Sequence, residues 1–304
     1  MRPTWEGVYP AVTTNFHSDE SLDIPTFVKN LEAQIDAGVH GIILCGSLGE
    51  NGTLLTEEKF LLLETTKNIV GDSLPVIMCI AECITREAMS FAKDCEELGA
   101  DGFMLLPPMR YPSDERETLR YLHRVADATD LPVMAYNNPV AYKTFISIPM
   151  FKDLAANPHF ESMKESTGDI RYMTDIIHTF GDRFKILSGV DDLALESLFM
   201  GADGWVAGLV DAFPRETVVI YELAKLGRWE EARAIYRWFA PLLHLDVNTK
   251  FVQNIKLAEQ VVGLGTEYVR EPRLPLAGEE RESVLRVIED SLKTRPDLSA
   301  YSDL

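Results

Sequence analysis

Basic side chains are scarce in this sequence. Its 304 residues include 29 lysines and arginines against 48 aspartates and glutamates, which gives a formal net charge of −19. Such a surface repels the phosphate backbone of nucleic acids and the anionic surface of membranes. Long apolar runs are absent too: no stretch approaches the roughly 18 residues of a membrane span, and residues 1–6 lack the apolar centre of a signal peptide. We expect a cytoplasmic protein that binds neither nucleic acid nor membranes.

Cysteine and histidine, the usual ligands of transition metals, are also few. The spacing of Cys79 and Cys83 matches no familiar metal site, and no two of the 6 histidines have the i, i+4 spacing of a helical zinc site. The 4 cysteines fall mostly in apolar runs, so we expect all of them to be reduced thiols in the core: Cys45, Cys79, Cys83 and Cys95. The sequence gives little support to a metal mechanism.

The sequence does contain a repeated alternation of short apolar runs and amphipathic segments. Strand-like runs begin about 20–35 residues apart, at 8–13, 41–45, 75–81, 102–106, 132–137, 160–164, 184–188 and 204–206. Helix-like segments separate most of them, at 26–37, 57–69, 87–98, 115–128, 170–180 and 193–200. This pattern predicts an α/β fold of the (β/α)8 TIM barrel type. A doubly wound sheet is the alternative, but Gly46-Ser47-Leu48-Gly49-Glu50-Asn51-Gly52 lacks the glycine spacing of a dinucleotide turn.

Helix ends and the C-terminal part complete this organisation. Thr56 precedes Glu57 and Glu58 and is expected to be an N-cap, whereas Gly38 and Gly99 are expected to be C-caps. After position 213 the strand-like runs stop, and helical segments follow at 216–226, 229–244, 249–262 and 279–291. We therefore divide the chain into a barrel core, 1–213, and the last barrel helix with a C-terminal helical extension, 214–304. The apolar content of the extension predicts that it packs on the barrel or on another subunit.

Lys164 lies at the end of the predicted strand 160–164, directly before a polar, glycine-containing turn. A lysine taken out of water either finds a carboxylate or gives up its proton and becomes a nucleophile. Such an amine can attack a ketone and form a Schiff base. The alternative is a solvated surface lysine, the commoner situation for this residue type.

Other polar residues follow neighbouring strands at the same predicted rim, where barrel enzymes carry their reactive groups. The turn Gly46-Ser47-Leu48-Gly49 could bind a carboxylate through its backbone N–H groups and the Ser47 hydroxyl, or be a plain tight turn. Tyr136 could relay protons, or be an ordinary aromatic at a strand end. Asp191 and Asp192 could bind substrate hydroxyls, although capping the next helix is expected of at least one of them.

Together these motifs resemble the signatures of the dihydrodipicolinate synthase and N-acetylneuraminate lyase family. The resemblance rests on Gly46-Ser47-Leu48-Gly49-Glu50, Tyr136-Asn137-Asn138-Pro139, Lys164-Glu165-Ser166-Thr167-Gly168-Asp169 and Ser188-Gly189-Val190-Asp191-Asp192. It spans nearly the whole chain. It implies a (β/α)8 barrel with a C-terminal helical extension, a lyase without metal or organic cofactor that acts on a small keto or imino acid, and a homo-oligomer, usually a tetramer, otherwise a dimer.

The resemblance also implies roles for single residues. Lys164 falls on the Schiff-base lysine and Tyr136 on the proton-shuttling tyrosine of the family. The carboxylate-binding turn would comprise Gly46, Ser47 and Leu48, and the substrate pocket would be lined by Gly189, Asp191 and Val206. Four further positions are weaker candidates: Arg110, Tyr111, Asn138 and Asp192.

Departures from the family pattern bear on the substrate. Leu48 stands where the synthase has a second hydroxyl residue, Ala141 stands where it has an arginine, and Pro108-Met109-Arg110-Tyr111 replaces its tyrosine pair. These differences argue against the synthase's own pyruvate condensation. The preferred prediction is deamination of pyrroline-4-hydroxy-2-carboxylate. The alternatives are cleavage or dehydration of a 2-keto-3-deoxy sugar acid, synthase-like condensation, and a non-catalytic barrel that only binds a ligand.

Overall fold

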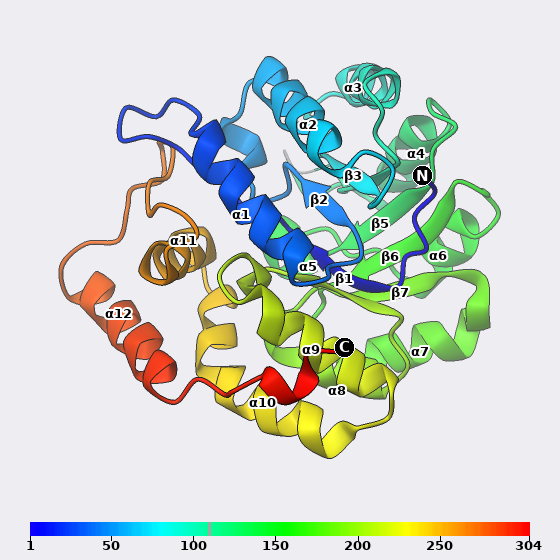
Figure 1. Cartoon of the computed structure of the whole chain (residues 1–304). Helices are drawn as coiled ribbons and strands as arrows, with labels where there is room; N and C mark the ends of the chain where they lie inside the picture. Colours follow the sequence, from blue (N-terminus) through cyan, green and yellow to red (C-terminus); the bar gives the residue numbers. More distant parts are fainter. Residues whose placement is uncertain (109–110) are drawn as a thin grey trace.

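A computed structural model describes residues 1–108 and 111–304 of the chain. Its centre is one 8-stranded parallel sheet in the order β1-β8-β7-β6-β5-β4-β3-β2 (Figure 1). The strands are β1 Gly7–Pro10, β2 Ile42–Leu44, β3 Val76–Ile80, β4 Gly102–Leu105, β5 Val133–Asn137, β6 Phe160–Glu165, β7 Lys185–Ser188 and β8 Gly204–Ala207. A parallel bridge between Ala11 and Ile43 joins the two ends of the sheet. The barrel is therefore closed, and the predicted fold is confirmed.

Helices surround the barrel and join successive strands (Figure 1). These are α1 Ile24–Asp36, α2 Thr56–Val70, α3 Thr85–Glu97, α4 Glu115–Ala126, α5 Pro139–Tyr142, α6 Ile148–Leu154, α7 Ile170–Phe180 and α8 Ala194–Phe199. The sequence did not predict the short α5 and α6, although each has a proline in its first turn. Their N-caps, Asn138 and Ser147, accept bonds from Ala141 N and Met150 N.

The predicted helix ends are partly right. Gly38 and Gly99 follow α1 and α3 with φ of +91° and +92°, left-handed conformations that favour glycine. The prediction for Thr56 is wrong, because Leu55 is the N-cap of α2 and Thr56 is already helical. The Glu58 carboxylate accepts a bond from the Leu55 N–H at 2.8 Å and moves the start of the helix back by one residue.

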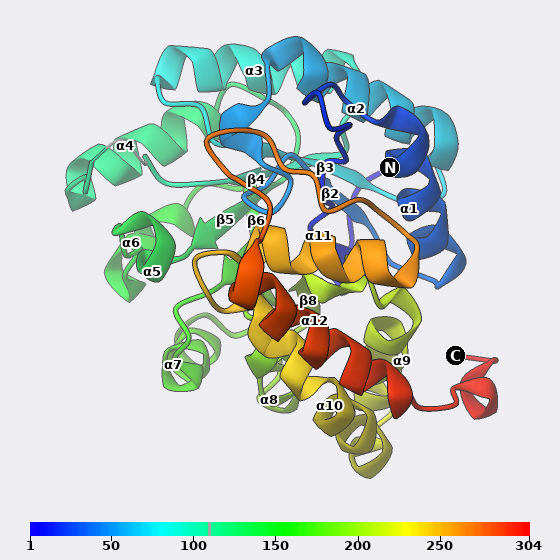
Figure 2. The ribbon, with the colours of Figure 1, turned by 90° about the vertical axis from the view of Figure 1, so that its left-hand side faces the viewer.

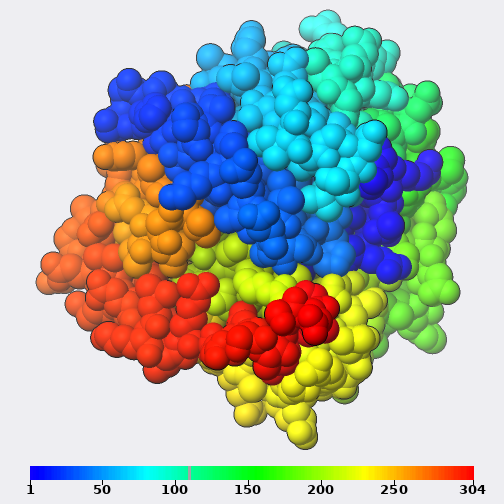
Figure 3. Space-filling view, viewed as in Figure 1, coloured from blue at the N-terminus to red at the C-terminus, as the bar shows by residue number. Residues whose placement is uncertain are grey.

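The C-terminal part consists of α9 Pro214–Lys225, α10 Trp229–Leu243, α11 Phe251–Val262 and α12 Gly278–Lys293. Figure 2 shows α11 and α12 next to each other, beside α10. An aromatic cluster joins α10 to the end of the barrel: the ring centroids of Phe213 and Phe239 lie 5.5 Å apart, and Trp238 stacks on Phe239. The last residues, red in Figure 3, lie on the surface beside α9, where Arg215 donates to Leu304 O at 3.0 Å.

The core is continuous and includes three of the four cysteines. Cys45, Cys79 and Cys95 are buried, and burial raises the pKa of the Cys45 thiol to about 12. The prediction for Cys83 is wrong, because Cys83 is exposed in the loop between β3 and α3, beyond the apolar run of the strand. Among the described residues, no helix is long and apolar enough to cross a membrane.

Candidate active site

Lys164 and Tyr136 lie side by side at the carboxyl ends of two neighbouring strands. In the register of β5 and β6, Tyr136 pairs with Lys164 and Asn137 pairs with Glu165. Side chains of paired residues in adjacent strands point to the same face of a sheet. The Lys164 Nζ accordingly lies 4.4 Å from the centroid of the Tyr136 ring.

Lys164 is buried without a counter-ion. Its relative exposure is 7%, so the alternative of a solvated surface lysine is wrong. Within residues 1–108 and 111–304, its Nζ makes no hydrogen bond to a protein group and no ion pair. The geometry therefore leaves this nitrogen available to bond to carbon.

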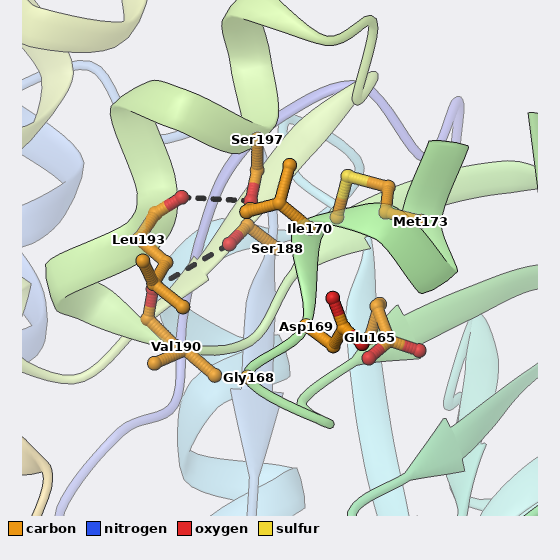
Figure 4. A pocket seen from close by; sticks show the side chains of 9 residues that line it. All are labelled: Glu165, Gly168, Asp169, Ile170, Met173, Ser188, Val190, Leu193 and Ser197. Carbon is orange, nitrogen blue, oxygen red and sulfur yellow. Dashed lines mark hydrogen bonds between the residues drawn. The ribbon is translucent and has the colours of Figure 1, made fainter. Parts of the chain in front are cut away.

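Glu165, the next residue, does not neutralise Lys164. Successive residues of a strand point to opposite faces, and the Glu165 carboxylate accepts bonds from Thr167 N at 2.6 Å and from Asn137 Nδ2 at 3.4 Å. Burial raises the pKa of Glu165 to about 7. Figure 4 shows Glu165 near Asp169, in a recess that residues of α7 and α8 also line. The recess, of about 10 Å³, has room for no more than about one water molecule.

Asn138 orients the phenol of Tyr136. Tyr136 is 5% exposed, and its hydroxyl accepts a bond from Asn138 Nδ2 at 3.0 Å. The other side-chain atom of Asn138, Oδ1, accepts from Ala141 N and caps α5. The side-chain amide of Asn138 is thus held at both its oxygen and its nitrogen. Since the Tyr136 oxygen accepts this bond, the hydroxyl proton of Tyr136 can point toward another acceptor.

Tyr142 joins this group, although the sequence analysis assigned it no role. Its hydroxyl is hydrogen-bonded to Ser47 Oγ, and its ring packs edge-on against Tyr136, with centroids 5.6 Å apart and planes at 78°. Burial raises the pKa of Tyr142 well above its usual value, and the nearby Tyr136 hydroxyl raises it further. The Asn-Pro pair that starts α5 was the available signal, since one helical turn after it returns the chain toward the strand end.

The turn after β2 is compact and needs glycine at position 49. Glu50 N donates to Ser47 O at 3.2 Å, and Asn51 N donates to Gly46 O at 3.1 Å. A Cβ on Gly49 would lie 2.8 Å from Val12 O, which is too close for any side chain. Gly46 and Leu48 are buried within this turn, whereas Ser47 is half-buried. The hydroxyl of Ser47 is thus the side-chain polar group that the turn presents toward α5.

A buried ion pair holds this turn in place. The Glu50 carboxylate and the Lys256 Nζ are both fully buried and lie 2.6 Å apart. Lys256 also donates to Tyr268 O at 2.6 Å, and Arg270 N donates to Glu50 at 3.2 Å. No local pattern in the sequence indicates this pair. It fastens the turn after β2 to α11 and to the segment that follows α11.

Comparison with known proteins decides the family. The model of the Dihydrodipicolinate synthetase family matches residues 4–291. The chain belongs to this family. The 4-hydroxy-tetrahydrodipicolinate synthase of Methanospirillum hungatei is 30% identical over 271 residues, which are 88% of this chain and 93% of that protein. The chain is accordingly a lyase of the class I aldolase type, an enzyme class that works through a lysine Schiff base.

Solved structures of the family superpose closely. The dihydrodipicolinate synthase of Aquifex aeolicus has a TM-score of 0.89 at 26% identity and covers 96% of this chain and 99% of its own. YagE, a prophage protein of the same family from E. coli K12 solved in complex with pyruvate, has a TM-score of 0.89 at 25% identity and covers 95% and 99%. The family relationship thus extends over the whole barrel and the C-terminal helices.

Gly189 gives Lys164 its space within this family fold. A Cβ on Gly189 would lie 2.6 Å from Lys164 Cε and would also collide with Ser166 Oγ. Ser166 Oγ donates to Gly189 O at 3.0 Å, and Gly189 N donates to Glu165 O at 2.8 Å. The loop after β7 therefore packs directly against the side chain of Lys164. Val206 lies on β8, buried and paired with Tyr9.

Asp191 is fully buried, and protein donors occupy its carboxylate. It accepts from Trp205 Nε1 at 2.8 Å, from Gly208 N at 3.1 Å and from Leu209 N at 2.8 Å. Burial raises its pKa, although these donors oppose the shift. The carboxylate joins the end of β7 to the end of β8, so a substrate hydroxyl would have to displace one of these donors.

Three weaker candidates remain: Asp192, Tyr111 and Arg110. The Asp192 carboxylate lies within hydrogen-bond distance of His244, with its Oδ2 3.0 Å from His244 Nδ1. Neither aspartate caps α8, so the prediction that at least one does is wrong; Leu193 occupies the N-cap position instead. Tyr111 is 53% exposed. Arg110 is outside the described residues. Across 1–108 and 111–304, no group of three or more histidine, cysteine, aspartate or glutamate side chains is arranged to hold a metal.

Proposed function

We propose that this chain is a Schiff-base lyase that deaminates pyrroline-4-hydroxy-2-carboxylate or a close hydroxylated cyclic imino acid. The observation that carries the proposal is the buried Lys164 Nζ, which lies beside the Tyr136 phenol and has no protein partner among the described residues. An electrophilic C2 next to a carboxylate is the substrate feature that such an amine attacks.

The reaction balances with Lys164 as nucleophile and Tyr136 as proton carrier. Nζ bonds to C2 while the C2–N bond of the ring breaks and the ring nitrogen takes a proton. Loss of a C3 proton gives an enamine, which expels the C4 hydroxyl as water. Tautomerisation then places an imine at C5. One water releases ammonia there and a second frees Lys164, so the net reaction consumes one water and yields a five-carbon oxo-aldehyde acid and ammonia.

The turn after β2 is proposed to hold the substrate carboxylate. Its backbone N–H groups and the Ser47 hydroxyl are the groups that suit an anion, as in other backbone nests. Leu48 is buried and apolar, and Ala141 offers no charge. These two residues favour a substrate with one carboxylate at the Schiff-base end and a hydroxylated, uncharged remainder.

A second candidate, aldol cleavage of a 2-keto-3-deoxy sugar acid to pyruvate and an aldehyde, has one specific observation in its favour. The similar protein YagE was solved in complex with pyruvate. The same lysine serves both reactions.

Coupled assays separate the two candidates. The purified protein is incubated with a panel of hydroxylated imino acids and 2-keto-3-deoxy sugar acids, and ammonia and pyruvate are measured in parallel. Ammonia release without pyruvate is the expected result. Pyruvate release without ammonia would replace the deaminase proposal by the aldolase, and release of neither from the panel would reject both substrates.

A further inference from the structure

Three hydroxyl groups from separate parts of the chain meet beside Lys164. Ser47 comes from the turn after β2, Tyr136 from the end of β5, and Tyr142 from the end of α5. Tyr142 bonds directly to Ser47 and packs edge-on against Tyr136. Tyr142 is therefore in contact with both of the other two residues.

The bond from Asn138 sets the direction in which protons can move. Asn138 Nδ2 donates to the Tyr136 oxygen at 3.0 Å, and an amide NH₂ cannot accept a proton in return. After Tyr136 gives its proton to a reacting oxygen, its new proton must come from another hydroxyl. Tyr142 is a phenol, which can donate and accept at once.

We propose that Tyr142 is a positioning residue that links Ser47 to Tyr136 and re-protonates Tyr136 from within the same chain. In each transfer the Tyr142 O–H bond breaks toward Tyr136, a new O–H bond forms with the proton of Ser47, and the half-buried Ser47 takes a proton from water, so no charge remains on any of the three hydroxyls. Tyr111, the other tyrosine considered near the site, is exposed and reaches none of these groups in the described structure.

The inference rests on the proposed Schiff-base function, but it does not depend on the final substrate. Exchange of the C3 protons of pyruvate for deuterium needs only the Schiff base and the proton carriers. We would follow this exchange by ¹H NMR in D₂O, and trap the pyruvate adduct with borohydride in the same samples.

The test compares Tyr142→Phe with a matched control. Phenylalanine keeps the ring that packs on Tyr136 and removes only the hydroxyl. The expected result is a fall in the exchange rate constant of about 10–10²-fold, with unchanged KM and an unchanged yield of trapped adduct. A group that transfers a proton directly to the substrate contributes about 10²–10⁴-fold, and Tyr142 acts only through Tyr136, so its effect should be smaller. Tyr221→Phe is the control: Tyr221 is buried in another part of the molecule, and its hydroxyl donates to Asp203 O at 3.0 Å, just before β8. Its exchange rate should not change.

A second variant removes the Ser47 hydroxyl, the other partner of Tyr142. Adding Ser47→Ala to Tyr142→Phe should lower the turnover number no further, because one break already interrupts the link. A Tyr142→Phe protein that exchanges as fast as Tyr221→Phe, or two substitutions whose effects multiply, would overturn the inference. Should Tyr142→Phe fail to fold, the exchange rate and pH profile of Ser47→Ala alone decide, and an unchanged rate constant at saturating pyruvate rejects the link. A wild-type protein that neither exchanges nor traps pyruvate would instead reject the Schiff-base function itself.

Discussion

Three lysines are buried among the described residues, Lys59, Lys164 and Lys256, and the last two differ most in what surrounds their nitrogens. Lys256 is fully buried, and its Nζ bonds both to the Glu50 carboxylate and to Tyr268 O, each at 2.6 Å. Lys164 is 7% exposed, and no protein group among residues 1–108 and 111–304 bonds to its Nζ. The comparison separates burial from bonding: both lysines are buried, but only the nitrogen of Lys164 has no bond to the described residues, which is what a nucleophilic amine requires.

The two lysines also have different structural roles: Lys256 holds the turn after β2, and Lys164 lies beside Tyr136. Burial lowers the pKa of Lys256, but the Glu50 carboxylate opposes this shift and keeps the pair together. A buried ion pair adds little net stability and is costly to break on one side. Its effect here is to fix the turn that carries Ser47, whereas Lys164 is left free beside Tyr136.

The largest expected effect is the loss of activity when Lys164 is replaced. Lys164→Ala should lower the turnover number by at least about 10⁴-fold, because it removes the covalent nucleophile. The matched variant Lys164→Met keeps an apolar stem packed against Gly189 and Tyr136, so it should lose the same activity while changing the free energy of unfolding by no more than about 1 kcal/mol. Steady-state kinetics and urea denaturation measure both. A variant that keeps its activity would contradict the assignment of Lys164.

Replacing Tyr136 tests the proton carrier beside that nucleophile. Tyr136→Phe should fold normally and lose about 10²–10⁴-fold in turnover, as expected for removal of a general acid–base group. The measurement is the turnover number at saturating substrate, with circular dichroism as the check on folding. Unchanged turnover would remove Tyr136 from the mechanism.

Breaking the ion pair should affect stability instead. Lys256→Met removes the buried cation and leaves the Glu50 carboxylate with only Arg270 N and, at 3.7 Å, the half-buried Arg273 guanidinium, so the free energy of unfolding should fall by about 3 kcal/mol in urea denaturation. The double variant Glu50→Gln/Lys256→Met removes both charges and should recover a large part of this loss. Equal stability of Lys256→Met and the wild-type protein would show that the pair does not hold the fold.

The smallest effect concerns pH and the carboxyl group next to Lys164. The pKa of Glu165 is raised from 4.5 to about 7 by burial. Between these values the folded protein holds a proton that the unfolded chain has lost, so stability falls as pH rises through this window and levels off above it. Glu165→Gln does not titrate, so its stability relative to the wild type should rise by up to about 3 kcal/mol between about pH 4 and pH 8. Parallel unfolding curves at both pH values check this, and a constant difference would mean that Glu165 ionises normally.

The sequence was sufficient for the barrel and for the position of Lys164. The alternation of apolar runs and amphipathic segments follows directly from strand and helix periodicity, and β6, Phe160–Glu165, ends one residue beyond the predicted strand. Paired registers then bring Tyr136 to Lys164. These features are local, or repeat along the chain, and a single sequence therefore contains them.

Features that depend on distant partners could not be predicted. Glu50 and Lys256 are 206 residues apart in the sequence, so nothing near either residue indicates the pair. Tyr142 reaches Ser47 because of α5, a helix of 4 residues that is too short to show periodicity. Asp191 was placed correctly at the end of β7, but its donors lie on and after β8, where only the folded barrel brings them close.

The most direct test of the central claim is a competition between Lys164 and Lys256 for one carbonyl compound. The wild-type protein is incubated with pyruvate, reduced with borohydride and digested, and the peptides that contain Lys164 and Lys256 are compared by mass spectrometry. We expect the mass of a reduced pyruvate adduct on the Lys164 peptide and none on the Lys256 peptide. An unmodified Lys164 peptide, or an adduct elsewhere in the chain, would contradict the account.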